Sequence, residues 1–169
     1  FCLWGITFID QNTPNWNLTL NYGIKPKVLT GILGIFTAPL IHINYSHLIG
    51  NTIPFMALAG IVLMNGRKKF IFTSIFCALF AGIGIWIFGA DGSIHTGSST
   101  LIFSYLGFIL VQAWLVRSLL TGLLALLSVS LYGTLLLTLL IDQDGISWHG
   151  HIFGLLGGLI AAILITQSP

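Results

Sequence analysis

The chain has 169 residues, of which 56% are hydrophobic and only 6% are charged, and its formal net charge is +2. This balance is far more apolar than that of a soluble domain and predicts an integral membrane protein. The few basic residues form no stripe, which excludes a nucleic-acid-binding protein. Cys2 and Cys77 stand in apolar stretches without paired or metal-type spacing, so they are expected to be packed thiols.

Five apolar segments are long enough to cross a bilayer, since a spanning helix needs roughly 20 mostly apolar residues. They are residues 45–65, 68–88, 98–116, 119–141 and 147–166. Residues 1–9 are apolar but too short to span, and we interpret them as the end of a first helix whose beginning is missing from this chain. The sequence therefore predicts an all-α membrane protein, a six-helix bundle that forms a single domain over residues 1–169.

The basic residues predict the orientation of this bundle, because they favour the cytoplasmic ends of short loops. Residues 67–69 are basic and lie between the second and third predicted helices, and Arg117 lies between the fourth and fifth. The long segment 10–44 also carries lysines, but long loops cross the membrane despite charge. Its apolar stretch, residues 28–41, is expected to lie partly in the membrane interface.

With this orientation, polar residues gather at the outer ends of the second, fourth and sixth helices. They are His42, His47 and Asn51 in the second helix, Gly97, Ser98, Ser99 and Thr100 in the fourth, and His149 and His151 in the sixth. His47 and Asn51 are four residues apart and share a helix face. His149 and His151 point to roughly opposite sides of a helix, so we assign His151 to a shared pocket and His149 to the interface.

Two simpler interpretations compete with a catalytic site. Ser98, Ser99 and Thr100 could merely cap the fourth helix, since hydroxyls accept hydrogen bonds from first-turn amides. Histidines on one side could bind a metal ion, but the chain has no His-Glu-x-x-His or Cys/His tetrad. The step from His42 to His47 is five residues and diverges on a regular helix, so no metal site is expected.

Gly150, Gly154 and Gly158 recur every four residues in the last predicted helix. Such rows of small residues let two membrane helices approach closely. The start of this helix, with His151, is therefore expected to contact another helix, and Ser99 would be its neighbour if that partner is the fourth.

Three segments together resemble the rhomboid family of intramembrane serine proteases, and the resemblance covers nearly the whole chain. Residues 42–51 are similar to the His-x4-His-x3-Asn segment of the family's second helix. Residues 95–108 resemble its Gly-x-Ser-Gly motif with the aromatic and glycine pattern that follows. Residues 148–162 resemble its sixth helix, with the catalytic histidine and a glycine row.

The resemblance implies a role for each matching residue. Ser99 would be the nucleophile, and His151 the general base that takes its proton. His47 and Asn51, with the backbone amide of Ser99, would line the oxyanion hole. The supporting positions would be His42, Gly97 and Phe103. Phe103, one turn after Ser99, would pack on the catalytic histidine.

The chain departs from the family pattern at two places. Thr100 stands where the motif usually has glycine, which bears on activity. The Trp-Arg pair often found in the first loop is absent around Leu33 and Gly34, which bears on loop structure only.

A Ser–His site also agrees with the general requirements of serine catalysis. A serine hydroxyl needs an adjacent base at neutral pH, and a neutral histidine suits that role. Asp91 and Asp144 are expected to be solvated loop residues, which leaves no intramembrane acid to orient the imidazole. A Ser–His dyad is therefore expected rather than a triad.

We expect a multi-pass endopeptidase of a bacterial inner membrane, with a site that opens to the outer, periplasmic face. Its partners would be the lipid bilayer and the transmembrane protein substrates that it cleaves near their outer ends, and it would need no cofactor. The alternative is an inactive rhomboid-fold protein that binds membrane-protein clients. A small-solute transporter is disfavoured because the polar residues stop near one face. The sequence specifies neither the substrate nor the oligomeric state.

Overall fold

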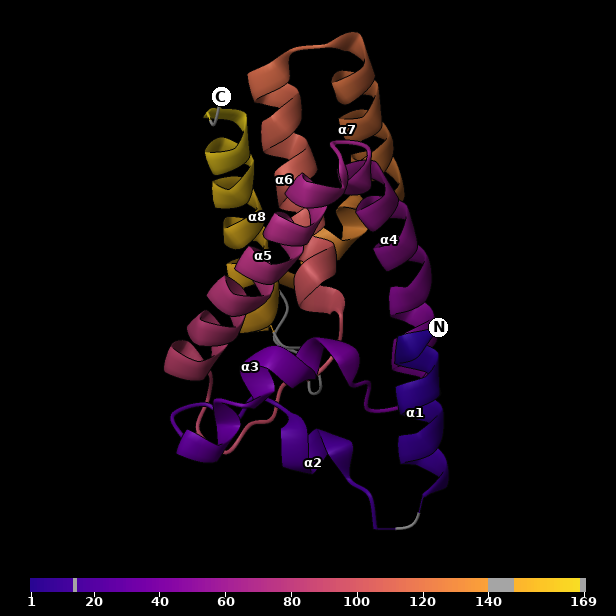
Figure 1. The fold of residues 1–169 in the computed structure, drawn as a ribbon, viewed down its shortest axis with the longest axis vertical. Helices are drawn as coiled ribbons and strands as arrows, with labels where there is room; N and C mark the ends of the chain where they lie inside the picture. The colour runs from indigo at the N-terminus through magenta and orange to yellow at the C-terminus, as the bar shows by residue number, and fades with distance from the viewer. Residues whose placement is uncertain (14, 140–147, 168–169) are drawn as a thin grey trace.

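The computed structural model describes residues 1–13, 15–139 and 148–167. Within those residues the fold is all-helical, without β-strands. Five helices are long and apolar enough to cross a bilayer. They are α4 (Tyr45–Leu63), α5 (Arg67–Phe88), α6 (Ser99–Val116), α7 (Leu119–Tyr132) with its 3-10 extension η3 (Gly133–Leu139), and α8 (Trp148–Gln167) (Figure 1). The five predicted segments are confirmed over the residues that the structure describes.

A shorter helix, α1 (Cys2–Asn12), lies beside α4. The Trp4 indole N–H donates to Thr52 Oγ1 at 3.2 Å, and the Asn12 amide donates to the Tyr45 hydroxyl at 3.3 Å. With 11 residues, α1 is shorter than a spanning helix needs to be. Five candidate spans are therefore established, and the count of six stays a prediction.

Between α1 and α4 the chain forms short helical pieces. They are α2 (Leu18–Tyr22), η1 (Leu29–Gly31), α3 (Gly34–Thr37) and η2 (Ala38–Leu40). Ile35 and Ala38 are buried, whereas Leu29, Leu33 and Phe36 are exposed. A segment with one buried side and one exposed apolar side fits the interfacial position predicted for residues 28–41.

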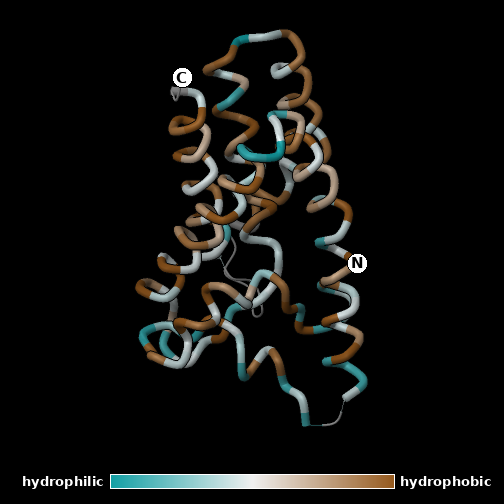
Figure 2. The backbone as a smooth tube through the Cα atoms, viewed as in Figure 1, coloured by the Kyte–Doolittle hydropathy of each residue, from teal (hydrophilic) through white to brown (hydrophobic). Residues whose placement is uncertain are grey.

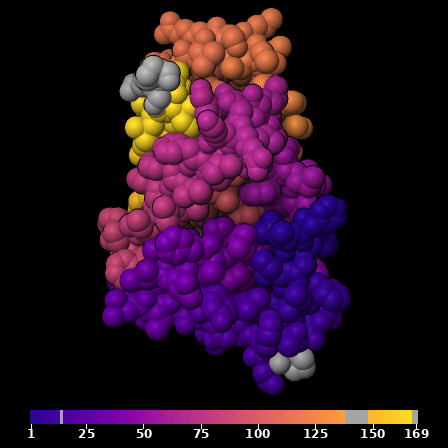
Figure 3. Space-filling model, in the orientation of Figure 1, coloured from indigo at the N-terminus to yellow at the C-terminus, as the bar shows by residue number. Residues whose placement is uncertain are grey.

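The loops divide between the two ends of the bundle. The basic α4–α5 and α6–α7 connections lie at one end, and the segment before α4 lies at the other with the α5–α6 loop (Figure 1). Hydrophobic residues follow the long helices, and the hydrophilic ones collect mainly at these ends (Figure 2). In the space-filling view the segment before α4 covers one end of the molecule (Figure 3). The basic loops thus share one end, as predicted.

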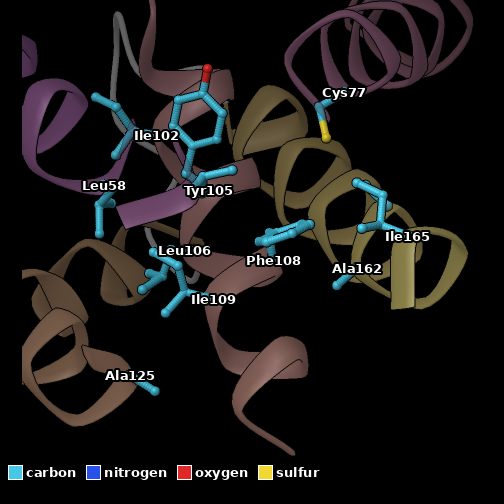
Figure 4. Close-up of a cluster of buried hydrophobic side chains, with 12 residues drawn as sticks. Leu58, Cys77, Ile102, Tyr105, Leu106, Phe108, Ile109, Ala125, Ala162 and Ile165 are labelled. Atoms are coloured by element: carbon cyan, nitrogen blue, oxygen red, sulfur yellow. The ribbon is translucent and has the colours of Figure 1, made fainter. Parts of the chain in front are cut away.

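Helix α6 is the centre of the bundle. Eight consecutive residues, 102–109, are buried, so this helix is enclosed on all sides. Its side chains form the main core with Leu58 of α4, Cys77 of α5 and Ala162 of α8 (Figure 4). The hydroxyl of Tyr105 hydrogen-bonds Ser74 Oγ at 2.8 Å, which satisfies a polar group buried in the core.

The glycine row of α8 packs directly on α6. A Cβ atom at Gly154 would collide with the carbonyl oxygen of Thr100, and one at Gly158 would collide with that of Ser104. Only glycine permits this approach of the two backbones. The predicted close contact of this helix is confirmed, and its partner is the helix that begins at Ser99.

Candidate active site

Backbone hydrogen bonds fix the α5–α6 loop against the first loop. Ile24 and His95 exchange N–H···O bonds of 3.0 Å in both directions. Two residues later, the Gly97 N–H donates to the carbonyl of Ala38 at 2.9 Å. The loop that leads into α6 is therefore held by a segment about 60 to 70 positions earlier in the chain.

Gly97 has a φ of +113°, in the region that favours glycine. A Cβ atom here would lie 2.6 Å from His47 Cε1 and 3.6 Å from Asn51 Nδ2. The first turns of α4 thus bring His47 and Asn51 against the loop that precedes Ser99. The structure brings together these three sequence-predicted positions.

Asn51 has a buried side-chain amide, Nδ2, with no hydrogen-bond partner among the described residues. Buried hydrogen-bond donors normally have an acceptor, so a donor without one beside the loop that precedes Ser99 needs an explanation. An amide donor in this position can bind an oxygen that gains negative charge during a reaction.

Ser99 is the first residue of α6 and is partly exposed. It lines a small cavity of about 10 Å³ together with Gly97, Thr100, Ala38 and Gly82. That volume is about the minimum needed for one water molecule. A nucleophile here has a recess beside it of about the size of one water molecule.

His151 lies in the first turn of α8, and its ring stacks on Phe103 of α6. The ring centroids are 4.2 Å apart and the planes differ by 14°. Phe103 is one turn after Ser99, so this stack holds the imidazole over the beginning of α6. Ser99 and His151 therefore occupy adjoining helix starts, and a hydrogen bond between them stays a prediction.

His42 was expected on the second helix, and that expectation is wrong. Asn44 caps α4 by accepting the N–H of His47 at 2.8 Å, so the helix begins at Tyr45 and His42 precedes it. The divergence argued from a regular helix does not apply, since the His42 and His47 rings meet edge to face at 5.2 Å. Among the described residues, no three His, Cys, Asp or Glu side chains gather as metal ligands.

A second serine, Ser98, hydrogen-bonds this histidine. Its Oγ lies 3.1 Å from His42 Nε2, and its backbone N–H donates to the same nitrogen at 3.3 Å. Ser98 is 1% exposed and His42 is 0% exposed, so no substrate reaches the pair without rearrangement. Burial, and to a lesser degree His47, lowers the pKa of His42 to about 4, which keeps this ring neutral at physiological pH.

His149 contacts the rings of Trp148 and His95. It packs on Trp148 at 3.7 Å between centroids and approaches His95 at 6.5 Å. His95 in turn hydrogen-bonds Ser93 Oγ at 2.8 Å. Burial, followed by repulsion from His149, lowers the pKa of His95 to about 4. From the sequence, His95 was placed at this membrane face and at the start of the serine-motif segment without a role of its own, and Ser93 was not singled out.

The remaining site expectations concern loops. Asp91 forms an exposed ion pair with Lys27 at 2.7 Å, and Asp144 lies outside the described residues. At Gly34, a Cβ atom would run into the backbone of Gly23 and Ile24. A larger residue therefore does not fit at Gly34 in this loop.

Comparison with known proteins found a matching family model and several bacterial relatives. A sequence model described as the rhomboid domain matches residues 30–168. An uncharacterized protein of Mycobacterium tuberculosis is 34% identical over 97% of this chain and 71% of its own length. An uncharacterized protein of Mycobacterium leprae is 35% identical over 97% and 67%. A Bacillus subtilis protein named "Putative rhomboid protease YdcA" is 24% identical over 79% and 67%.

Proposed function

This chain belongs to the rhomboid family, and from that premise we propose that it is an intramembrane serine endopeptidase. Its nucleophile would be Ser99 and its general base His151. Family membership and the five apolar helices establish an integral, multi-pass membrane protein. Family membership does not establish proteolytic activity, which is what we propose here.

One observation carries the proposal: the stack of His151 on Phe103 holds an imidazole from α8 over the helix start that bears Ser99. Around the same helix start, Asn51 offers an unpartnered buried amide and His47 touches the position of Gly97. A nucleophile, a base and candidate oxyanion donors from three helices then share one end of the bundle.

In the proposed reaction, Ser99 Oγ attacks the scissile carbonyl carbon while its proton passes to His151. The Asn51 amide, His47 and the Ser99 N–H would stabilise the resulting oxyanion, aided by the positive end of the α6 dipole. Collapse breaks the C–N bond, and His151 gives its proton to the leaving amine. A water molecule then loses a proton to His151 and hydrolyses the acyl ester.

The proposed substrates are transmembrane segments of other membrane proteins, cut near their outer ends within the lipid bilayer. The site lies at the end of the bundle opposite the basic loops, which supports an opening to the outer face. The similar proteins described above are bacterial, which supports a bacterial membrane; the inner membrane and the periplasmic side are part of the proposal. In this proposal residues 1–169 form one domain, and α1 takes the place of the first of six helices.

The decisive experiment uses purified protein and a model transmembrane substrate. Ser99→Ala and His151→Ala should each lower the cleavage rate by about three orders of magnitude or more. Ser99→Ala should also abolish labelling by a fluorophosphonate. His149→Ala is the matched control and should change the rate far less. A Ser99→Ala protein that still cuts the substrate would exclude this nucleophile.

Thr100 favours one other candidate, an inactive rhomboid-fold protein that binds membrane-protein clients. Thr100 stands at the motif glycine position and is one of the residues that line the small cavity beside Ser99. If the wild type takes no serine probe while Thr100→Gly does, the natural protein is the client-binding form. Probe labelling of the wild type supports the protease.

A further inference from the structure

We propose that His42 and Ser98 are positioning residues, which together hold the turn before α6 so that the Ser99 amide and hydroxyl face the reacting carbonyl. This inference rests on the proposed function. It assigns a task to the second Ser–His pair of the site, which the proposed reaction does not use.

The first support is the geometry of the pair. Ser98 is joined to His42 Nε2 twice, through its backbone N–H at 3.3 Å and its hydroxyl at 3.1 Å. An N–H can bind this nitrogen only if the nitrogen carries a lone pair, so Nε2 acts as the acceptor of a neutral ring. The contact with His42 therefore fixes the backbone of Ser98 as well as its side chain.

The second support is that the Ser98 hydroxyl does not cap its own helix. Ser98 is the N-cap residue of α6, and a serine there usually accepts a first-turn amide. Ser98 makes no such capping bond. The alternative that this hydroxyl merely caps its helix is therefore wrong for Ser98, because its side chain is turned to His42.

The amides at the start of α6 are only partly bonded within the helix. The first amides of a helix have no acceptor within the helix, and the N-cap side chain normally supplies one. The carbonyl of Ser98 is engaged by the N–H groups of Leu101 and Ile102, at 3.0 and 3.1 Å. A capping side chain reaches only the second or third amide of a helix, so the Ser99 N–H, which is the first, has no acceptor within α6. The bond from Ser98 to His42 acts by fixing where that amide lies.

The third support is the place of His42 in the fold. It is fully buried, and it contacts His47 edge to face at 5.2 Å. A few residues earlier in the same segment, the carbonyl of Ala38 accepts the Gly97 N–H at 2.9 Å. His42 thus joins the first loop, the start of α4 and the turn before Ser99.

A catalytic role for the pair is excluded by its burial. Ser98 and His42 are 1% and 0% exposed, whereas Ser99 is partly exposed and lines the cavity. The pair cannot meet a transmembrane substrate in this conformation, so it acts through Ser99.

The test measures kcat and KM on a transmembrane substrate, with the competent fraction counted by fluorophosphonate titration. His42→Ala should lower kcat per titrated site by about ten- to a hundredfold with little change in KM, since displacing a reacting group by about 1 Å can cost that much. Ser98→Ala keeps the backbone bond and should cost less. His42→Gln supplies an acceptor near the Nε2 position and should recover part of the loss.

Ser93→Ala is the matched control, because it removes a serine hydroxyl that bonds a histidine in the same loop. It should leave kcat within about twofold. Adding Ser98→Ala to His42→Ala should cost nothing more, since the two act as one unit. A purely structural role would instead lower the titrated fraction or the Tm and leave kcat per site unchanged.

Each outcome decides a separate question. If Ser99→Ala is inactive while kcat per site is unchanged in His42→Ala and Ser98→Ala, the positioning role is wrong and the protease stands. If Ser99→Ala is active, the proposed function itself fails. Should His42→Ala not fold, an unchanged kcat in Ser98→Ala would still overturn the inference.

Discussion

The contact between α6 and α8 predicts that Gly154→Ala damages activity more than stability. A Cβ atom at this position would lie 3.3 Å from Phe103 Cβ and would collide with the Thr100 carbonyl oxygen. Both partners belong to the first turns of α6, beside the proposed nucleophile. The added methyl group therefore acts where the His151–Phe103 stack is held.

The size of the effect follows from the collision. The carbonyl belongs to the backbone and cannot rotate away, so α8 must move by on the order of 1 Å at its first turns. A misplacement of that size can cost about a hundredfold in rate, and overpacking of a membrane core is expected to cost about 1 to 3 kcal/mol. Alanine regains up to about 1 kcal/mol through its better helix propensity, which offsets part of the loss in stability.

The assay compares kcat on a transmembrane substrate and the Tm of Gly154→Ala with those of Gly122→Ala. Gly122 lies in α7 and has no atom within 4 Å of an added Cβ, so it shares the propensity gain without the collision. Gly122→Ala should match or exceed the wild type in Tm and keep its kcat. Wild-type kcat in Gly154→Ala would refute the reasoning that this helix contact positions the site.

Three more predictions follow from the loops and the site. The pKa of His42 is about 4 in the fold and about 6.5 when unfolded, so the unfolded chain binds more protons between these values. The contribution of His42 to stability should therefore fall by about 3 kcal/mol as the pH drops from 6.5 to 4. Thermal unfolding at pH 7 and pH 4 checks this, and His42→Gln should lose that part of the slope. With Cys2 replaced by serine, a cysteine at Asp91 should react with an impermeant thiol reagent from outside intact cells and one at Lys68 should not; the reverse pattern would invert the topology. Thr100→Gly should enlarge the recess beside the nucleophile and extend cleavage to bulkier residues, as product mapping on a substrate series would reveal; an unchanged preference would mean that Thr100 does not limit the site.

The sequence was sufficient to predict the membrane helices and part of one helix contact. Spanning segments can be predicted because each needs about 20 apolar residues in a row, and composition alone displays them. The pairing of α8 with α6 was half predictable. The spacing of Gly154 and Gly158 indicated a close approach, and only the three-dimensional fold identified the partner.

The supporting geometry of the site could not be predicted in the same way. The bonds from Ile24 to His95 and from Ala38 to Gly97 join backbone groups, which have no side-chain signature. His42 was misplaced because helix periodicity was extended backward past Asn44, the residue that caps α4. For Ser98, residue type suggested a cap, but a hydroxyl can bind its own helix or a neighbour, and the sequence does not distinguish these.

The position of His151 in α8 has a consequence for the synthesis of the protein. A ribosome makes the chain from the N-terminus, so the helix with Ser99 enters the membrane before the helix with the proposed base. Until the glycine face of α8 packs against α6, Ser99 has no base to take its proton. If the proposed function holds, the enzyme is therefore inactive until its last helix is in place. Unfinished chains then do not cleave other newly made proteins at the same insertion site.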